Sequence, residues 1–306
     1  MDNIQFVIDE IYKKNKKLKI TGKNADYIPE LKKINPNLFA IAIYTVNGEQ
    51  YNVGDVEKEF AIESVSKVFS LALALKTVGL SNVSKMIGDR HTNSAFNSIK
   101  AMEDSSTHTI NSFQNSGAIA TTSIYYDKNP AKFEKTIFDN MAIFAGRKLT
   151  YSKKIFDSEM DNIDHNLAIG YLLNSYGRFY GEVLPTVTAY TKQCSAMANS
   201  DDIALMGATI ANYGINPKTG KRAINAKFIP YIVNHMVANG LYGYSETWMN
   251  NVGIPAKSGV GGVIMMVVPG VMGISIISPP LDKYGNSVKG IITAKMLSKQ
   301  LRLTKV

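Results

Sequence analysis

The sequence of 306 residues is poor in metal-binding and disulfide-forming side chains. It has one cysteine, Cys194, and no Cys-x-x-Cys pair. A single thiol excludes an intramolecular disulfide and favours a reducing compartment, so we expect a cytoplasmic protein. The four histidines, at positions 91, 108, 165 and 235, do not have the spacing of metal ligands. We therefore expect neither a metal site nor a cofactor.

Long apolar runs are also missing. No stretch reaches the roughly 18 uninterrupted apolar residues of a membrane-spanning helix, so we expect no membrane association. The first segment, MDNIQFVIDEIYKKNKKLKI, mixes apolar and charged residues throughout. That pattern is typical of an amphipathic helix and differs from a signal peptide or anchor.

The net charge of +9 raises the question of a nucleic-acid partner. The strongest local candidate is KKNKKLK at 13–19. It lies on the predicted helix, has no aromatic residues between the lysines, and is followed by no recognisable nucleic-acid-binding module. We interpret it as a solvated helix face and expect no nucleic-acid partner.

The pattern of apolar residues predicts strands at both ends of the chain and helices between them. LFAIAIYTVNGEQYNVG at 38–54 reads as a hairpin that turns at Asn47-Gly48. VGGVIMMVVPGVMGISIISPPLD at 260–282 reads as two strands joined at Pro269-Gly270. Helical periodicity dominates from Ser64 to about 250, and helices are expected at about 3–17 and 287–301, with a loop at 26–31.

This order of elements predicts an α+β fold. Strands from the two ends would form one antiparallel sheet, with the terminal helices on one face and a helical lobe attached. We expect a single domain over 1–306. Its sheet lobe would comprise about 1–60 and 252–306, and its helical lobe about 61–251.

Ser64 and Lys67 lie in ESVSKVF at 63–69, and Ser64 is the only serine followed three residues later by lysine. On a helix these two positions share a face. A serine hydroxyl needs a base to act as a nucleophile, and a lysine serves when burial or nearby positive charge lowers its pKa. The flanking residues are apolar, which suits such a site. The alternative is a capping serine followed by a lysine that reaches for solvent.

A second motif, AKSGVGG at 256–262, contains Lys257-Ser258-Gly259. Penicillin-recognising serine hydrolases pair a helical Ser-x-x-Lys with a Lys-[Ser/Thr]-Gly strand in this order. A second match, Lys218-Thr219-Gly220, lies in the polar segment NPKTGKR, which we interpret as a turn. The third element of that set, Ser-x-Asn, is absent, which argues against a β-lactam enzyme.

Over nearly its whole length the chain resembles the serine-dependent glutaminase family. The segments that carry the resemblance are GKNADYIPEL (22–31), FAIESVSKVFSLALAL (60–75), FNS (96–98), NSGAIA (115–120), QCS (193–195), GLY (240–242), VGIPAKSGVGG (252–262) and SPPLDKYGNSVKG (278–290). The resemblance implies a fold like that of β-lactamases and transpeptidases, and hydrolysis of the L-glutamine side-chain amide to L-glutamate and ammonia. It also implies a homodimer or homotetramer. A penicillin-recognising hydrolase and a catalytically inactive glutamine-binding relative stay open as alternatives.

The same resemblance implies roles for individual residues in catalysis. Ser64 would be the nucleophile, Lys67 its base, and Tyr190 the group that passes the proton to the leaving amine. Backbone N–H groups of Ser64 and Val260 would form the oxyanion hole. Gly259 and Gly261 would let the strand approach closely, and Lys257 would add positive charge that keeps Lys67 neutral.

The remaining residues implied by the resemblance would bind the zwitterionic end of glutamine: Tyr27, Asn115, Glu159, Asn166 and Tyr242. Glu159 suits the ammonium group. Glu159 and Asn166 are seven positions apart, so two turns of one helix would place them on the same face. Outside the resemblance, each has an ordinary interpretation as a solvated, turn-forming or core residue. Glu63 and Gly243 depart from the family pattern, which has glutamine and aspartate there.

Overall fold

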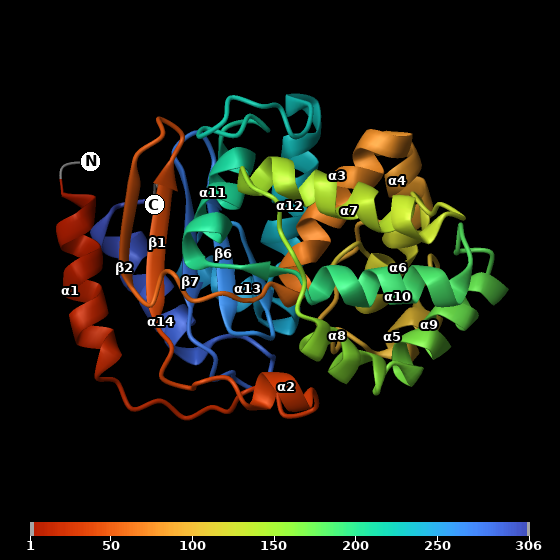
Figure 1. The fold of residues 1–306 in the computed structure, drawn as a ribbon, viewed down its shortest axis with the longest axis horizontal. Coiled ribbons are helices and arrows are strands. Elements are labelled where there is room, and N and C mark those ends of the chain that lie inside the picture. Colours follow the sequence, from red (N-terminus) through yellow and green to blue (C-terminus); the bar gives the residue numbers. More distant parts are fainter. Residues whose placement is uncertain (1–2, 305–306) are drawn as a thin grey trace.

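The computed structural model describes residues 3–304, so residues 1–2 and 305–306 of the predicted domain lie outside the described part. Five antiparallel strands form the main sheet in the order β2-β1-β7-β6-β5. Their bounds are β1 (Ala40–Thr45), β2 (Gln50–Gly54), β5 (Ala256–Gly259), β6 (Val263–Val268) and β7 (Met272–Ile277). Ala40 pairs with Gly54 on one side and with Ile277 on the other. The predicted sheet built from both ends of the chain is confirmed (Figure 1).

Both predicted turns join adjacent strands of this sheet. Gly48 follows Asn47 between β1 and β2 with φ of 92°, and Gly270 follows Pro269 between β6 and β7 with φ of 73°. These left-handed conformations cost glycine little because it has no Cβ. The hairpins are therefore encoded locally.

The sheet is covered on both faces (Figure 1). Helices α1 (Ile4–Lys16) and α14 (Val288–Gln300) pack side by side on one face, as predicted, and α1 buries Ile4, Ile8 and Ile11 at helical spacing. Helix α11 (Ser200–Ala211) packs on the other face. A Cβ at Gly273 of β7 would lie 2.1 Å from the Ala208 nitrogen, so glycine permits this close approach. A helix from the range assigned to the helical lobe thus belongs to the sheet layer.

The remaining helices form the lobe beside the sheet, except α13 (Ser245–Asn251), whose Trp248 packs in the apolar cluster that also holds Ile264 of β6 and Leu297 of α14. The helices of the lobe are α2 (Pro29–Lys32), α3 (Ser66–Val78), α4 (Leu80–Ile87), α5 (Ile99–Asp104), α6 (Asn115–Ser123), α7 (Pro130–Ala145), α8 (Lys153–Met160), α9 (Asp164–Ser175), α10 (Val183–Cys194), α12 (Ile229–Asn239) and the 3₁₀ helices η1 (Glu63–Val65), η2 (Ala226–Phe228) and η3 (Tyr242–Tyr244). Two short strands, β3 (Phe60–Ala61) and β4 (Met197–Ala198), pair outside the main sheet and were not predicted. No described helix is both long and apolar enough to cross a membrane.

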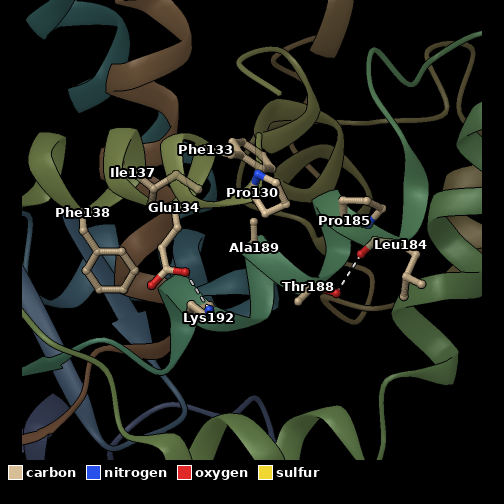
Figure 2. A pocket seen from close by; sticks show the side chains of 10 residues that line it. All are labelled: Pro130, Phe133, Glu134, Ile137, Phe138, Leu184, Pro185, Thr188, Ala189 and Lys192. Atoms are coloured by element: carbon tan, nitrogen blue, oxygen red, sulfur yellow. Dashed lines mark hydrogen bonds and ion pairs between the residues drawn. The ribbon is translucent and has the colours of Figure 1, made fainter. Parts of the chain in front are cut away.

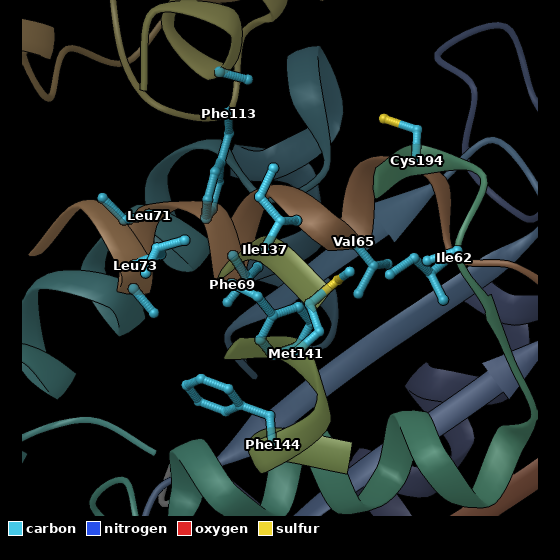
Figure 3. Close-up of a cluster of buried hydrophobic side chains, with 14 of the residues drawn as sticks. Ile62, Val65, Phe69, Leu71, Leu73, Phe113, Ile137, Met141, Phe144 and Cys194 are labelled. Atoms are coloured by element: carbon cyan, nitrogen blue, oxygen red, sulfur yellow. The ribbon is translucent and has the colours of Figure 1, made fainter. Parts of the chain in front are cut away.

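Helix α3 forms the centre of the lobe. All its residues from Ser66 to Leu75 are buried, so it is surrounded by other elements on every side. Figure 3 shows Ile137, Met141 and Phe144 of α7 directed at it, and the rings of Phe69 and Phe144 are 5.0 Å apart. Close packing of this kind fixes the position of the first turn of α3, which carries Lys67.

Candidate active site

Ser64 lies in η1, and α3 begins two residues later at Ser66. The N-cap of α3 is Val65, so the interpretation of Ser64 as a capping serine is wrong. Ser64 is 9% exposed and Lys67 is fully buried. The two residues are joined by continuous helical backbone, in which positions three apart share a face. Neither side chain extends into bulk solvent.

The Lys67 amine has two hydrogen-bond acceptors. It donates to the Phe113 carbonyl oxygen at 3.0 Å and to Asn115 Oδ1 at 2.7 Å. Burial lowers the pKa of Lys67 to about 8, against the opposing effect of the nearby Glu63 carboxyl. Within residues 3–304 no hydrogen bond joins it to Ser64. The amine is therefore held in place and is readily neutral.

Lys257, on β5, is the second fully buried lysine of the candidate site. It donates to the carbonyl oxygens of Gly240 at 3.0 Å and Ser258 at 2.7 Å. The ring of Tyr242 lies beneath both amines, 4.1 Å from Lys257 Nζ and 5.8 Å from Lys67 Nζ. Burial and the positive charge of Lys67 hold the pKa of Lys257 well below its usual value. Because the two ammonium groups repel each other, the site disfavours the doubly charged state.

The strand that carries Lys257 packs against η1. A Cβ at Gly259 would lie 2.7 Å from the Ile62 carbonyl oxygen, and one at Gly261 would lie 2.7 Å from the Ala61 carbonyl oxygen. Only glycine permits this approach without a shift of the backbone. Val260 lies between these glycines and is 6% exposed. Its backbone thus runs beside the segment that holds Ser64.

Asn115, the first residue of α6, connects several of the predicted residues. Its Oδ1 accepts hydrogen bonds from Lys67 at 2.7 Å and from the Tyr190 hydroxyl at 3.3 Å, and its Nδ2 donates to Asn166 Oδ1 at 3.3 Å. Burial raises the pKa of Tyr190 well above its usual value, so its hydroxyl keeps its proton. Four residues from four helices therefore share one network.

Glu159 and Asn166 belong to different helices. Helix α8 ends at Met160 and α9 begins at Asp164, so the prediction that one continuous helix carries both residues is wrong. Ser195, which was not predicted as a site residue, donates its hydroxyl to Glu159 Oε1 at 3.1 Å. Burial raises the pKa of the Glu159 carboxyl to about 8. The sequence signal for Ser195 was its place in QCS, one of the segments that carry the family resemblance.

The two tyrosines of the predicted site differ in exposure. Tyr242 is 3% exposed, has a left-handed φ of 57°, and its hydroxyl makes no hydrogen bond of good geometry within the described chain. Tyr27 is 52% exposed as a whole residue. Burial, followed by the charge of Glu63, raises the pKa of its hydroxyl. Tyr27 therefore lies at the edge of the site and Tyr242 inside it.

Comparison with known proteins decides the family. The Glutaminase family model matches residues 22–305. The chain belongs to the glutaminase family. It is 42% identical to glutaminase 1 of Shigella flexneri and of Escherichia coli K12, over 98% of this chain and 96% of each relative. It is 41% identical to a glutaminase of Nostoc, over 97% of this chain and 88% of the relative.

Solved structures agree with this assignment. A probable glutaminase with 42% identity superposes with a TM-score of 0.96, covering 98% of this chain and 97% of the other. A probable glutaminase from Bacillus subtilis in complex with 6-diazo-5-oxo-L-norleucine has 26% identity and a TM-score of 0.90, covering 100% and 97%. The fold is thus the α+β fold of the serine β-lactamase-like glutaminases, as predicted. The enzyme hydrolyses the side-chain amide of glutamine, and the matches decide against the penicillin-recognising and inactive alternatives.

Glu63 is a feature of this glutaminase that the sequence indicated only as a departure from the family pattern. It directly precedes Ser64, is 3% exposed, and has a left-handed φ of 49°. Its Oε1 has no hydrogen-bond partner in the described structure. Burial, followed by the charge of Glu159, raises the pKa of Glu63 well above its usual value. Positive φ at a non-glycine residue is not readable from the residue type.

The glutaminase also has a hollow of about 320 Å³ between α7 and α10, away from these residues (Figure 2). It is lined mainly by apolar side chains, including Phe133, Ile137 and Leu184, and the ion pair of Glu134 and Lys192 at 2.7 Å borders it. The α10 residues that line it lie on the opposite side of that helix from Tyr190. The hollow is therefore separate from the candidate site.

Proposed function

We propose that the glutaminase acts through a γ-glutamyl ester on Ser64, with Lys67 as the base. The observation that carries this proposal is the buried Lys67 amine, held by two acceptors one helical turn from Ser64. A neutral amine has two N–H groups and one lone pair. The Phe113 and Asn115 oxygens use both N–H groups, which leaves the lone pair to accept the Ser64 proton.

Acylation then follows from this arrangement. Ser64 Oγ attacks the amide carbon of glutamine as its proton moves to Lys67 Nζ, and the carbonyl oxygen gains the negative charge. The backbone N–H groups of Ser64 and Val260 would stabilise that oxygen, and the close approach at Gly259 and Gly261 supports this. Breakdown of the tetrahedral intermediate breaks the C–N bond and leaves the ester.

Tyr190 would donate the proton that the leaving nitrogen needs. Its hydroxyl shares the acceptor Asn115 Oδ1 with Lys67, so a proton lost by Tyr190 is replaced from the Lys67 ammonium nearby. Ammonia leaves, and a water molecule then attacks the ester with Lys67 as base again. Glutamate is released and Ser64 regains its proton.

The zwitterionic end of glutamine would bind on the helical side of the site. Glu159 would accept the α-ammonium group, which its burial and single hydrogen bond to Ser195 support. Asn115, Asn166, Tyr27 and Tyr242 would supply the donors for the α-carboxylate. Lys257 would help to keep Lys67 neutral, because the positive charges of the two ammonium groups repel each other.

Mass spectrometry of the protein quenched in acid during turnover tests the ester. We expect an adduct with the mass of one glutamyl group on the peptide that contains Ser64. Ser64→Ala should lose the adduct and release no ammonia. Ser66→Ala is the matched control, because Ser66 contacts Cys194 instead of the site residues and should keep both. An active Ser64→Ala variant would eliminate Ser64 as the nucleophile.

We further infer a homodimer or homotetramer and a cytoplasmic location. The family resemblance supports the first, and the lone, buried thiol of Cys194 supports the second. Light scattering of the purified protein measures the assembly, and a monomer at micromolar concentration would contradict it.

A further inference from the structure

The buried Glu63 side chain is energetically unfavourable, and none of the roles proposed above accounts for it. Its carboxyl is 3% exposed and Oε1 lacks a hydrogen-bond partner among residues 3–304. Burying an unpaired carboxyl oxygen is unfavourable. The left-handed backbone at Glu63 adds strain, which persists only where the surrounding structure enforces it. Both costs fall on the residue that directly precedes the proposed nucleophile.

Hydrogen bonds on both sides of the site place Glu63 next to Glu159. The N–H of Ile62 donates to the Ala196 carbonyl oxygen at 2.9 Å, and the adjacent Ser195 donates its hydroxyl to Glu159 Oε1 at 3.1 Å. The titratable side chains whose charges act with it come from different elements: Lys67, Glu159, Tyr27, Cys194 and Tyr242. On the strand side, Cβ atoms at Gly259 and Gly261 would lie 3.2 Å from Glu63 Cβ and 3.5 Å from Glu63 Cγ. These glycines offer no side chain to pair with the carboxyl, so no described group on the strand side uses the free oxygen.

Lys67 does not pair with the Glu63 carboxyl. Its amine donates to Phe113 and Asn115, and no ion pair joins it to Glu63 in the part of the chain that the structure describes. Glu159, the proposed acceptor for the α-ammonium group, already accepts a hydrogen bond from Ser195 at one oxygen. An ammonium group brings three N–H donors and therefore needs further acceptors.

We propose that Glu63 is a second carboxyl of the ammonium subsite, so that the α-ammonium of glutamine binds between Glu63 and Glu159. This extends the proposed function, which assigns only Glu159 to that group. The two carboxyls repel each other in the empty site, where at least one keeps a proton. An incoming cation replaces that proton. Glu63 would thus select amino acids over analogues that lack the α-amino group.

Direct binding of two ligands to the full-length enzyme tests this. L-glutamate and glutarate differ only in the α-amino group, and titration calorimetry gives the Kd of each. We expect Glu63→Gln to weaken L-glutamate binding about tenfold or more and to leave glutarate binding unchanged or tighter. Glu103→Gln, on an exposed turn of α5, is the matched control and should change neither.

The outcomes separate this inference from the function on which it rests. An equal loss of both ligands, or no loss of either, in Glu63→Gln would overturn it. If Glu159→Gln discriminates between the ligands and Glu63→Gln does not, only the role of Glu63 fails. If neither variant discriminates, the proposed ammonium subsite itself is wrong.

A measurement on the wild-type enzyme covers the case in which Glu63→Gln does not fold. Calorimetry in two buffers of different ionisation enthalpy counts the protons released on binding. We expect L-glutamate to release more protons than glutarate, because only L-glutamate brings the ammonium that displaces the proton of the carboxyl pair. Equal proton counts for the two ligands would contradict the proposal.

Discussion

Two Lys-[Ser/Thr]-Gly tripeptides occur in this chain in opposite environments. Lys257-Ser258-Gly259 is buried on β5, and its lysine donates to two carbonyl oxygens beside Tyr242. Lys218-Thr219-Gly220 is an exposed turn, as predicted, where the Asn216 side chain accepts the backbone N–H groups of Lys218 at 2.9 Å and Thr219 at 3.0 Å. A capping side chain makes the second a turn, whereas pairing with β6 makes the first a strand. The tripeptide alone therefore carries little information about function.

Replacing the two lysines should give the largest difference. We expect Lys257→Met to lower kcat/KM by about 100-fold or more, because it removes one of the two amines that we propose control proton transfer at Ser64. Lys218→Met should leave ammonia release from glutamine unchanged. Equal activities of the two variants would show that burial does not distinguish the tripeptides.

Replacing the glycines of the two tripeptides should lower kcat at Gly259 and lower stability at Gly220. Gly259→Ala places a Cβ 2.7 Å from the Ile62 carbonyl oxygen, which should push β5 away from η1 and lower kcat by about tenfold. At Gly220 a Cβ meets nothing within 4 Å, but φ is 69°. Gly220→Ala should therefore cost about 1 kcal/mol of unfolding free energy with unchanged kcat. Denaturant unfolding and steady-state kinetics on both variants measure the two effects, and a lowered kcat in Gly220→Ala would refute the contrast.

The pH dependence should show the smallest effect. Because the pKa of Lys67 is about 8 and the base must be neutral, kcat/KM should be high above pH 8 and fall as pH drops through it. Removing the Lys257 charge relieves repulsion of the Lys67 ammonium, so the acid limb of Lys257→Met should move to higher pH by about half a unit to one unit. The limb of Lys218→Met should stay in place. A shift to lower pH in Lys257→Met would contradict the repulsion.

The sequence predicted those features that neighbouring residues determine. Asn47-Gly48 and Pro269-Gly270 mark turns by themselves, and the terminal helices show their apolar spacing over several turns. The short strands β3 and β4 were missed, because pairing of residues far apart in the chain defines them. The break between α8 and α9 was missed because the residues from Asp161 to Ile163 include neither glycine nor proline.

For the candidate site, the sequence identified residues but not their surroundings. Ser64, Lys67 and Lys257 stood out by motif, and the resemblance supplied the others. What the sequence did not contain was the environment of each group. Neither the backbone strain nor the unpaired oxygen of Glu63 follows from its residue type, and the mutual effect of two buried amines depends on the tertiary arrangement.

The pairing of β1 with β7 has a consequence for how the enzyme is made. Ala40 leaves the ribosome long before its partner Ile277, and the strand that carries Lys257 also emerges late. Such distant pairing delays folding. The segment that carries Ser64 is therefore made long before β5, the strand that packs against it. A chain released before β5 is made lacks one side of the candidate site, so we expect it to have no amidase activity and to leave the cell's glutamine intact.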